Sequence, residues 1–306
     1  YTKKIHNINV HIYGAHIFHT NNYEVWNYIN QFTKFNNYIH SPLAVYKENY
    51  YNLPFNLNTF RQIFGNLNTD EIKNIIQNEI NESKIINPKN LEEQAISQIG
   101  KTVYEILIKG YTEKQWGKKA SDLPIEIIKR IPVRFTENNN YFNDEFQGIP
   151  VDGYTNIINK MLEKSKIILN CNFNDNKNEL LKLCNKVFYT GQIDEYFNYS
   201  HGELEYRSLN FVNELLDQEY FQKTAVVNYT EYNIPYTRII EHKHFENSQS
   251  KKTIITKEYP VKWDKNKECY YPVNDEKNNY LFNQYKKMIE QEKNIIMVGD
   301  LDYINI

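Results

Sequence analysis

The sequence predicts a mixed α/β protein in which strand-forming segments flank a helical insert. Three observations support this fold class. Apolar and polar residues alternate over positions 8–12, apolar residues recur at helical spacing between positions 59 and 131, and alternation with many Tyr and Thr returns from 204 to 275. A chain of 306 residues can bury a large core, and its length is typical of about two domains.

The composition argues against some partners and favours a reducing compartment. Lys and Arg total 36 against 38 Asp and Glu, and no long run carries one sign, so neither nucleic acid nor a membrane surface is an expected partner. No apolar run is long enough to cross a membrane, and no signal peptide precedes the first strand-like segment. Cys171, Cys184 and Cys269 are odd in number and lack metal-ligand spacing, which favours free thiols and a cytoplasmic location.

The first segment predicts a strand followed by a loop that carries two histidines. Alternation over positions 8–12 ends at Gly14, and the sequence GAHIFHT then places His16 and His19 three residues apart on a turn. Such a pair could bind a metal, but no further His, Cys or carboxylate completes a ligand set, so no metal is expected. Two loop histidines held by backbone groups are the structural alternative.

The next segments predict a helix and a hairpin. Asn21 and Glu24 form a capping-box pattern ahead of apolar residues at helical spacing. Residues 42–55, PLAVYKENYYNLPF, then predict two strands with a turn from Lys47 to Asn49.

Between positions 59 and 131 the pattern is helical. Asn68 with Glu71, and Asn90 with Glu93, predict two capped helices. Gly100 interrupts the second helix, after which helical spacing resumes.

Beyond the insert, short helices and strands are expected to alternate. A helix over residues 125–131 should end at Pro132, and residues 133–150 should follow as strand and loop. Residues 152–164 predict an amphipathic helix, and residues 167–169 a short strand. Another strand, over residues 186–190, should end at Gly191 before the sheet-forming segment.

Aromatic and cationic side chains gather in residues 110–135, GYTEKQWGKKASDLPIEIIKRIPVRF. Tyr111, Trp116, Lys129 and Arg130 are the main candidates for binding a ligand. An aromatic face can stack on a base and a guanidinium can hold phosphate oxygens, so the stretch predicts a site for a nucleotide diphosphate. Composition alone leaves a structural reading open, because aromatics and arginines also serve cores and helix ends.

The amino-acid sequence of this stretch closely resembles the corresponding segment of the UDP-galactopyranose mutase family. Other matching motifs are GAHIFHT, PFNLNTF at residues 54–60, NNYF with Tyr141, KVFYTGQID, LEYRSL with Arg207, IPYTRIIEHKHF with Arg238, and CYYPVND with Tyr270 and Tyr271. The resemblance runs from Tyr1 to about Val298. It implies a FAD/NAD-binding Rossmann-like domain assembled from non-contiguous segments, a helical insert domain and an antiparallel β-sheet domain.

The resemblance also implies domain boundaries. Residues 1–38, 150–200 and 290–306 would form part of the FAD-binding domain, and residues 59–131 the helical insert. Residues 39–58, 132–149 and 201–289 would form the sheet that holds the substrate.

The activity implied is that of a bacterial flavoprotein isomerase of cell-wall polysaccharide biosynthesis. Such a chain would interconvert UDP-galactopyranose and UDP-galactofuranose through a covalent adduct to N5 of reduced FAD. The ring can open only after the anomeric carbon has left UDP, and NADPH or NADH is the expected reductant of the flavin. A homodimer is possible, since dimers are usual among bacterial relatives.

Candidate site residues follow from the matched motifs. Catalytic roles fall on Arg130, Arg238 and His16. Expected substrate contacts are Tyr111, Thr112, Trp116, Tyr141, Tyr271 and Arg207. The flavin would be bordered by Gly14, Ala15, His16 and His19.

The sequence departs from the family pattern at three places. None of the ten glycines belongs to a G-x-G-x-x-G turn, His40 stands where many relatives have Asn, and Asp300 stands where relatives have Arg. We therefore expect an internal fragment of a mutase, with a shortened homologue as the alternative. Two other functions stay open, a UDP-sugar-binding homologue without flavin and a flavin-dependent oxidoreductase of the same fold.

Overall fold

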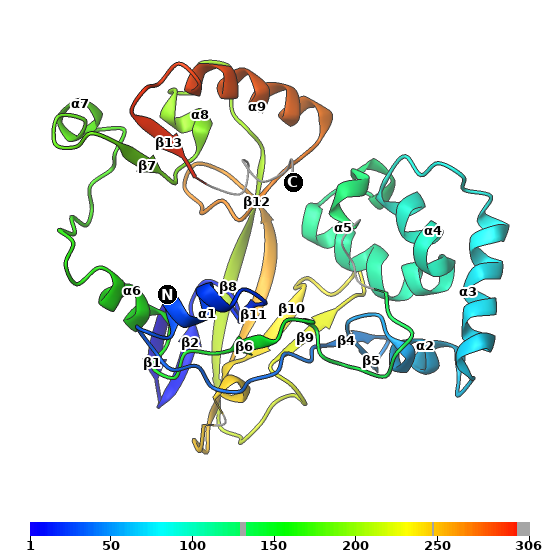
Figure 1. Ribbon diagram of the computed structural model, residues 1–306. Coiled ribbons are helices and arrows are strands. Elements are labelled where there is room, and N and C mark those ends of the chain that lie inside the picture. Colours follow the sequence, from blue (N-terminus) through cyan, green and yellow to red (C-terminus); the bar gives the residue numbers. More distant parts are fainter. Residues whose placement is uncertain (129–132, 247, 299–306) are drawn as a thin grey trace. The chain divides into compact units, whose positions relative to one another are not determined.

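Figure 1 shows a computed structural model of the chain, which describes residues 1–128, 133–246 and 248–298. The chain divides into two compact units. The larger unit comprises Tyr1–Lys164 and Leu209–Val261, and the smaller unit comprises Ser165–Ser208 and Lys262–Ile306. Each unit therefore combines two separate stretches of sequence. The three-domain division expected from the sequence stays a prediction.

The larger unit is built on a sheet whose strands follow the order β8-β11-β10-β9-β4-β5. These strands are β4 (Leu43–Tyr46), β5 (Asn49–Asn52), β8 (Tyr206–Leu216), β9 (Val226–Tyr229), β10 (Arg238–Glu241) and β11 (Thr253–Lys262). Strand β8 begins, and β11 ends, in the smaller unit. Strand β10 pairs antiparallel with β9 and β11, as the alternation in this segment predicts. Strand β4 pairs with β9 in parallel, so the early hairpin extends the sheet formed by later sequence.

The hairpin β4–β5 turns where the sequence predicts. Lys47 and Glu48 both have positive φ, 47° and 65°, at the two central positions of the turn. Two successive left-handed residues give a turn whose twist matches that of the flanking strands. The antiparallel pairing of Leu43 with Asn52 and of Tyr46 with Asn49 follows from this turn.

The helical insert begins and ends its helices largely at the expected caps. It contains α2 (Leu57–Phe64), α3 (Thr69–Ser83), α4 (Leu91–Val103), a π-helical stretch (Tyr104–Lys109) and α5 (Gly110–Trp116). The Asn68 side chain accepts from the backbone N–H of Glu71, and the Glu71 carboxylate accepts from that of Asn68. The Asn90 side chain likewise accepts from the N–H of Glu93. These bonds satisfy N–H groups that have no partner inside a helix.

Gly100 interrupts α4, as predicted, with a φ of 78°. The Thr102 N–H that follows this break donates to Glu79 Oε2 at 2.9 Å. A Cβ at position 100 would lie 2.4 Å from the same oxygen, so any larger residue displaces the carboxylate that satisfies the break. Helix α3, which carries Glu79, is thereby joined to α4.

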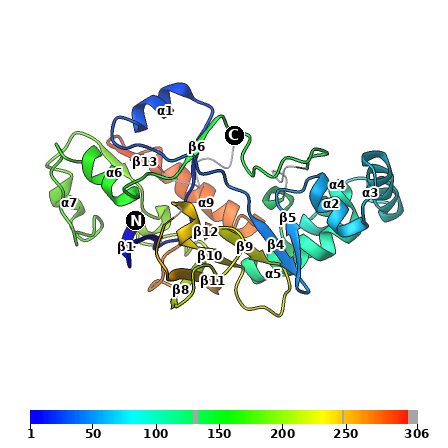
Figure 2. The same ribbon diagram turned by 90° about the horizontal axis from the view of Figure 1, so that it is seen from below.

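Figures 1 and 2 both show α2 to α5 gathered together beside β4 and β5. One hydrophobic core joins them to the hairpin and includes Tyr51, Phe60, Ile76, Leu91, Ile99 and Tyr104. The isoleucines that recur at helical spacing are therefore core residues, which leaves the polar side chains at the edge of the insert to face a ligand.

The first residues of the larger unit form short elements that flank the sheet. They are β1 (Thr2–Ile5), β2 (Ile8–His11), β3 (Phe18–Thr20) and α1 (Tyr23–Ile29), and the later β6 (Phe146–Gly148) and α6 (Tyr154–Met161) belong to the same unit. The cap of α1 differs from the prediction, because Asn22 rather than Asn21 accepts from the N–H of Glu24. The Asn21 side chain instead bonds Asp144 and the backbone N–H of Glu145.

Three further predictions are wrong in detail. His19 lies in β3, which pairs with β6, and not on a turn. The described part of the helix predicted at 125–131 is a 3₁₀ turn, Ile125–Ile127, because consecutive β-branched residues disfavour the α-helix. Residues 167–169 form no strand although the structure describes them; they are exposed, with no neighbouring strand to pair with. The expected helix end at Pro132 lies outside the described residues.

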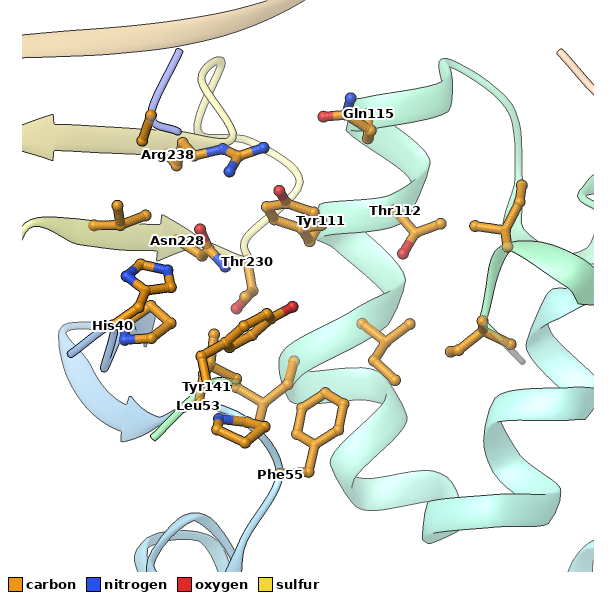
Figure 3. A pocket seen from close by; sticks show the side chains of 18 of the residues that line it. His40, Leu53, Phe55, Tyr111, Thr112, Gln115, Tyr141, Asn228, Thr230 and Arg238 are labelled. Atoms are coloured by element: carbon orange, nitrogen blue, oxygen red, sulfur yellow. The ribbon is translucent and has the colours of Figure 1, made fainter. Parts of the chain in front are cut away.

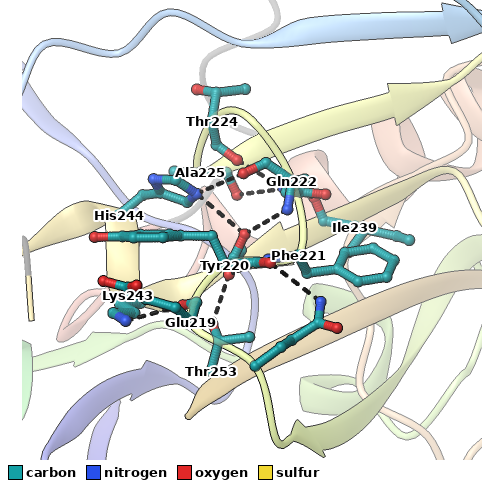
Figure 4. A network of polar contacts seen from close by, with 12 residues as sticks. Glu219, Tyr220, Phe221, Gln222, Thr224, Ala225, Ile239, Lys243, His244 and Thr253 are labelled. Atoms are coloured by element: carbon teal, nitrogen blue, oxygen red, sulfur yellow. Dashed lines mark hydrogen bonds and ion pairs between the residues drawn. The ribbon is translucent and has the colours of Figure 1, made fainter. Parts of the chain in front are cut away.

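A buried carboxylate anchors the connection between β8 and β9. Glu241, at the end of β10, is fully buried and accepts from the backbone N–H groups of Phe221 and Gln222 and from Thr253 Oγ1. Its other partner is His244 Nε2, at 3.0 Å. Figure 4 draws this network and labels the partners Phe221, Gln222, His244 and Thr253. Burial alone raises the pKa of this carboxyl, but the bonds outweigh burial and hold the pKa below its ordinary value.

The smaller unit contains a parallel pair of strands. Its elements are α7 (Lys177–Leu180), β7 (Val187–Tyr189), α8 (Ile193–Tyr196), β12 (Tyr271–Pro272), α9 (Glu276–Ile289) and β13 (Ile295–Met297). Strand β7, predicted from the sequence, pairs with β13 in parallel, and Gly191 follows it. Tyr285 of α9 is fully buried and forms a core with Ile193 and Leu204.

Candidate functional site

A cavity of about 580 Å³ lies in the larger unit, lined by the helical insert, the sheet and the loop before β3. The insert contributes Tyr111, Thr112, Gln115 and Trp116. The sheet contributes Val226, Asn228 and Arg238, together with Thr230 directly after β9. Other segments contribute Ala15, His16, His19, His40, Tyr141 and Phe142. Figure 3 shows Tyr111 reaching from α5 toward the strands that carry Asn228 and Arg238. Residues far apart in sequence thus surround one space.

Helix α5 is seated directly on the end of the sheet. Gly110 has no room for a side chain, since a Cβ there would lie 2.4 Å from the carbonyl oxygen of Thr230. The Lys114 ammonium donates to the carbonyl oxygens of Tyr229 and Tyr236 at 2.6 and 2.9 Å. Burial lowers the pKa of Lys114 to about 8. These contacts fix the distance between Tyr111 and the sheet.

The position of Arg238 is determined by its cross-strand partners on the two flanking strands. On β11 its cross-strand partner is Glu258, and the Arg238 Nε lies 3.0 Å from Glu258 Oε2. Burial raises the pKa of this carboxyl, while the guanidinium opposes that rise. The Arg238 side chain is 26% exposed and lines the cavity, so a cation supported by a buried carboxylate faces the ligand space.

On β9 the cross-strand partner of Arg238 is Asn228. Within the described residues the Oδ1 of Asn228 is buried without a hydrogen-bond partner. A polar atom in this condition on a cavity wall is suited to receive a donor from a ligand. Sequence reasoning missed Asn228. The one available signal was an amide inside a strand, where Asn is uncommon.

The loop that carries Tyr141 is held by side-chain bonds to its backbone. Asn56, which caps α2, is fully buried and donates to the Asn138 carbonyl at 2.9 Å. The Arg134 guanidinium donates to the carbonyl oxygens of Asn140 and Tyr141 at 2.6 and 3.1 Å. The PFNLNTF and NNYF motifs therefore act together, because the first fixes the backbone of the second.

His40 is buried in the cavity wall in its neutral form. Its Nδ1 lies 3.2 Å from the Tyr38 hydroxyl, its carbonyl accepts from the Tyr141 N–H, and its ring stacks on Phe142. Burial, with the charges of Arg238 and His19, lowers the pKa of His40 to about 4. A neutral imidazole is a hydrogen-bonding group that adds no charge to the site.

His16, in the loop before β3, and His19, in β3, are both exposed and both line the cavity. His19 stacks on Phe142, and its Nδ1 lies 2.5 Å from Asp144 Oδ2. His16 follows Gly14, whose φ of 92° turns the chain toward the cavity wall. Gly14 itself does not line the cavity, whereas Ala15 does.

Most of the predicted site residues meet at this cavity. They are Ala15, His16, His19, Tyr111, Thr112, Trp116, Tyr141 and Arg238. Arg207 and Tyr271 belong to the smaller unit, where they are cross-strand partners in the pairing of β8 with β12. Arg130 and Lys129 lie outside the described residues. Among the missed residues, Thr230 and Gln115 line the cavity, and Thr230 Oγ1 donates to the Ile106 carbonyl in the π-helical stretch before α5.

Residues 106–303 match a family model described as GLF: UDP-galactopyranose mutase. The chain belongs to the UDP-galactopyranose mutase family. The resemblance found in the sequence motifs is thereby confirmed.

Curated relatives include mutases named for two different nucleotide sugars. A probable UDP-galactopyranose mutase of Klebsiella pneumoniae is 39% identical over 293 residues, which cover 95% of this chain and 76% of that protein. A dTDP-fucopyranose mutase of Escherichia coli is 36% identical over 301 residues, covering 96% and 80%. A UDP-galactopyranose mutase of Mycoplasma genitalium is 35% identical, covering 95% and 76%.

A solved structure supports the fold class. The crystal structure of reduced UDP-galactopyranose mutase superposes with a TM-score of 0.57 at 15% identity, covering 84% of this chain and 64% of that one. At this identity the likeness shows the fold alone. The fold is the mixed α/β, Rossmann-like fold of the family, which confirms the class predicted from the sequence.

The family depends on a flavin, and the described residues suit one part of that cofactor. The Gly14 turn brings backbone groups of Ala15 and the exposed imidazole of His16 to the cavity wall, which suits the polar edge of a flat ring. A diphosphate cradle does not fit in the same way. The sequence contains no G-x-G-x-x-G, and the helix after β7 carries Asp194 and Glu195 in its first turn, where anions repel phosphate.

Proposed function

We propose that the cavity of the larger unit is a UDP-sugar site and that the chain acts as a UDP-galactopyranose mutase. This isomerase interconverts UDP-galactopyranose and UDP-galactofuranose. The observation that best supports the site is that Tyr111 on α5 and Arg238 on β10 line one cavity. An aromatic face for the base and a guanidinium for the diphosphate are the two groups that such a ligand requires.

We assign each of these residues a role toward the substrate from the chemistry of its side chain. Tyr111 stacks on uracil with Thr112 beside it, and Trp116 borders the sugar. Arg238 neutralises the diphosphate, and the Tyr141 hydroxyl donates to it. Arg130, outside the described residues, is proposed as the second cation for the diphosphate. Arg207 and Tyr271 are proposed as further substrate contacts.

A reduced flavin, when bound, supplies the nucleophile for C1 of the sugar, with NADPH or NADH as the proposed reductant. The chain's own task is to make UDP a good leaving group. Two cations stabilise the charge that develops on the diphosphate, and this stabilisation is strongest where water is excluded. Burial of His40 beside Arg238 adds a neutral neighbour, which does not compete with the diphosphate for the cation.

Location and assembly complete the proposal. Among the helices of the described residues, none is both long and apolar enough to span a bilayer. We propose a cytoplasmic location and a homodimer. UDP-galactose is the proposed small-molecule partner, with no nucleic acid and no membrane involved.

The deciding experiment is a turnover assay with paired substrates. The chain is incubated with FAD, dithionite and UDP-galactofuranose, and formation of UDP-galactopyranose is followed by chromatography. We expect conversion without net consumption of reductant, and a lower kcat/KM for dTDP-fucofuranose. Binding of UDP with neither flavin nor conversion would instead identify a non-catalytic UDP-sugar-binding protein. Substrate-dependent loss of reducing equivalents would identify an oxidoreductase.

A further inference from the structure

Two buried imidazoles connect the cavity loop to the sheet of the larger unit. His11 is the last residue of β2 and is 2% exposed, and His242 follows β10 and is 1% exposed. The backbone N–H of His16 donates to His11 Nδ1 at 3.2 Å. The backbone N–H of His11 in turn donates to His242 Nδ1 at 3.2 Å.

The direction of the hydrogen bonds that join His16, His11 and His242 is determined. A backbone N–H can only donate, so both Nδ1 atoms are acceptors and each neutral ring carries its proton on Nε2. His242 Nε2 lies 2.6 Å from Thr256 Oγ1, and that hydroxyl donates to Asn213 Oδ1 at 2.5 Å. A second proton on either ring would break one of these bonds. Burial lowers the pKa of His11 to about 4 and holds that of His242 well below its ordinary value, in agreement with two neutral rings.

The carbonyl of His16 is held from the opposite direction. The Tyr154 hydroxyl, on α6, donates to this oxygen at 3.1 Å. The Tyr154 ring packs edge-on against both His11 and His16, at centroid distances of 5.6 and 6.0 Å. His11 also stacks on Phe245 at 4.9 Å, which fixes the plane of its ring.

We propose that His11, held by His242, and Tyr154 are positioning residues that fix the backbone of His16 in the cavity wall. They bind both the N–H and the carbonyl of a residue whose own side chain is exposed to the cavity. The loop 14–16 thus presents a single arrangement to a bound ligand, at no cost in ordering when the ligand arrives. This inference rests on the proposed function only in taking the cavity as the ligand site.

Amide hydrogen exchange tests the proposal without any need for turnover. His11→Leu removes the acceptor, whereas His11→Asn offers an amide oxygen close to the position of Nδ1. Exchange is followed by mass spectrometry on peptic fragments that span residues 12–18, with fragments of α4 as the reference. We expect His11→Leu to accelerate exchange in the first region on the order of ten-fold or more, and His11→Asn to restore most of the protection. Equal exchange in both variants, or acceleration spread over α4 as well, would overturn the assignment.

Tyr154→Phe provides a second variant that keeps the ring and loses only the donor. This variant too should accelerate amide exchange in residues 15–17 and leave exchange in α4 unchanged. It decides the proposal if His11→Leu does not fold. In the turnover assay, His11→Leu and Tyr154→Phe are expected to lower kcat while the Kd for UDP stays within about two-fold, since UDP is assigned to Tyr111 and Arg238. A wild-type chain without activity would defeat the proposed function, yet the exchange data would still decide this inference.

Discussion

Arg238 takes its orientation from a carboxylate on the neighbouring strand. Glu258 is nearly fully buried, and an unpaired carboxylate there would be costly, so the pair with Arg238 stabilises both groups. The geometry also leaves part of the guanidinium facing the cavity. The pairing with Glu258 on the neighbouring strand therefore orients the Arg238 guanidinium toward the cavity.

Arg238→Ala tests this role directly. A hydrogen bond to a charged group contributes about 1.5–3 kcal/mol, so the Kd for UDP should rise on the order of ten- to a hundred-fold. Isothermal titration with UDP gives the measurement. Lys252→Ala, which removes one member of an exposed ion pair with Asp217, is the control and should leave the Kd unchanged.

Glu258→Gln separates orientation from charge. It keeps the shape of the side chain and an oxygen that can accept from the guanidinium, but it removes the negative charge that holds Arg238, so we expect weaker UDP binding than in the wild type and stronger binding than in Arg238→Ala. Wild-type affinity in both variants would remove Arg238 from the site.

At the scale of elements, the seating of α5 determines the width of the cavity. Gly110 touches the Thr230 carbonyl, Lys114 bonds two further carbonyls of the same sheet end, and Tyr111 lies between them in sequence. The π-helical stretch Tyr104–Lys109 precedes this contact and adds a residue per turn just before α5 begins. Helix α5 is therefore a rigid support for the proposed base-stacking residue.

Gly110→Ala should push α5 away from the sheet. The added Cβ would meet backbone atoms at 2.4 and 2.9 Å, which cannot move as a side chain can. We expect a loss of about 1–3 kcal/mol in the free energy of unfolding and weaker UDP binding, measured by urea denaturation and calorimetry. Asn74→Ala, on the exposed face of α3, is the matched helical control. Unchanged stability and affinity in Gly110→Ala would show that this close approach does not set the cavity.

Over the whole molecule, buried neutral imidazoles make the fold sensitive to acid. Burial lowers the pKa of His11 and of His40 to about 4, and it holds the pKa of His242 well below its ordinary value. Each folded-state pKa lies below the unfolded value of about 6.5, so the unfolded chain binds more protons between pH 6.5 and 4. Stability from these groups is present above pH 6.5 and is lost as the pH falls through this range.

The expected result is a falling urea midpoint from pH 7 to pH 4.5. His11 and His40 should each contribute a loss of up to about 2–3 kcal/mol toward the acid end of the range. His40→Asn should flatten the dependence, while His6→Asn, at an exposed position, should leave it as in the wild type. A midpoint that does not change with pH in the wild type would contradict neutral buried rings.

The sequence by itself determined the fold class, the family and many local elements of this chain. The Asn68–Glu71 capping box, the break at Gly100 and the hairpin turn after Tyr46 depend on residues only a few positions apart, and such signals can be read directly. Most of the site residues named from the motifs also line the cavity. Their roles toward a ligand stay proposals.

Only the tertiary structure decided which distant groups meet. His11 and His242 are separated by 231 positions, and the pairing of Arg238 with Asn228 and Glu258 follows from strand register. Strand register and packing depend on the whole sheet at once, so no local sequence pattern predicts them. The same reason explains the errors. The segment 167–169 has strand-like residues, but none of the strands that the structure describes pairs with it. The Asn21 side chain bonds Asp144, 123 residues away, and does not cap the helix.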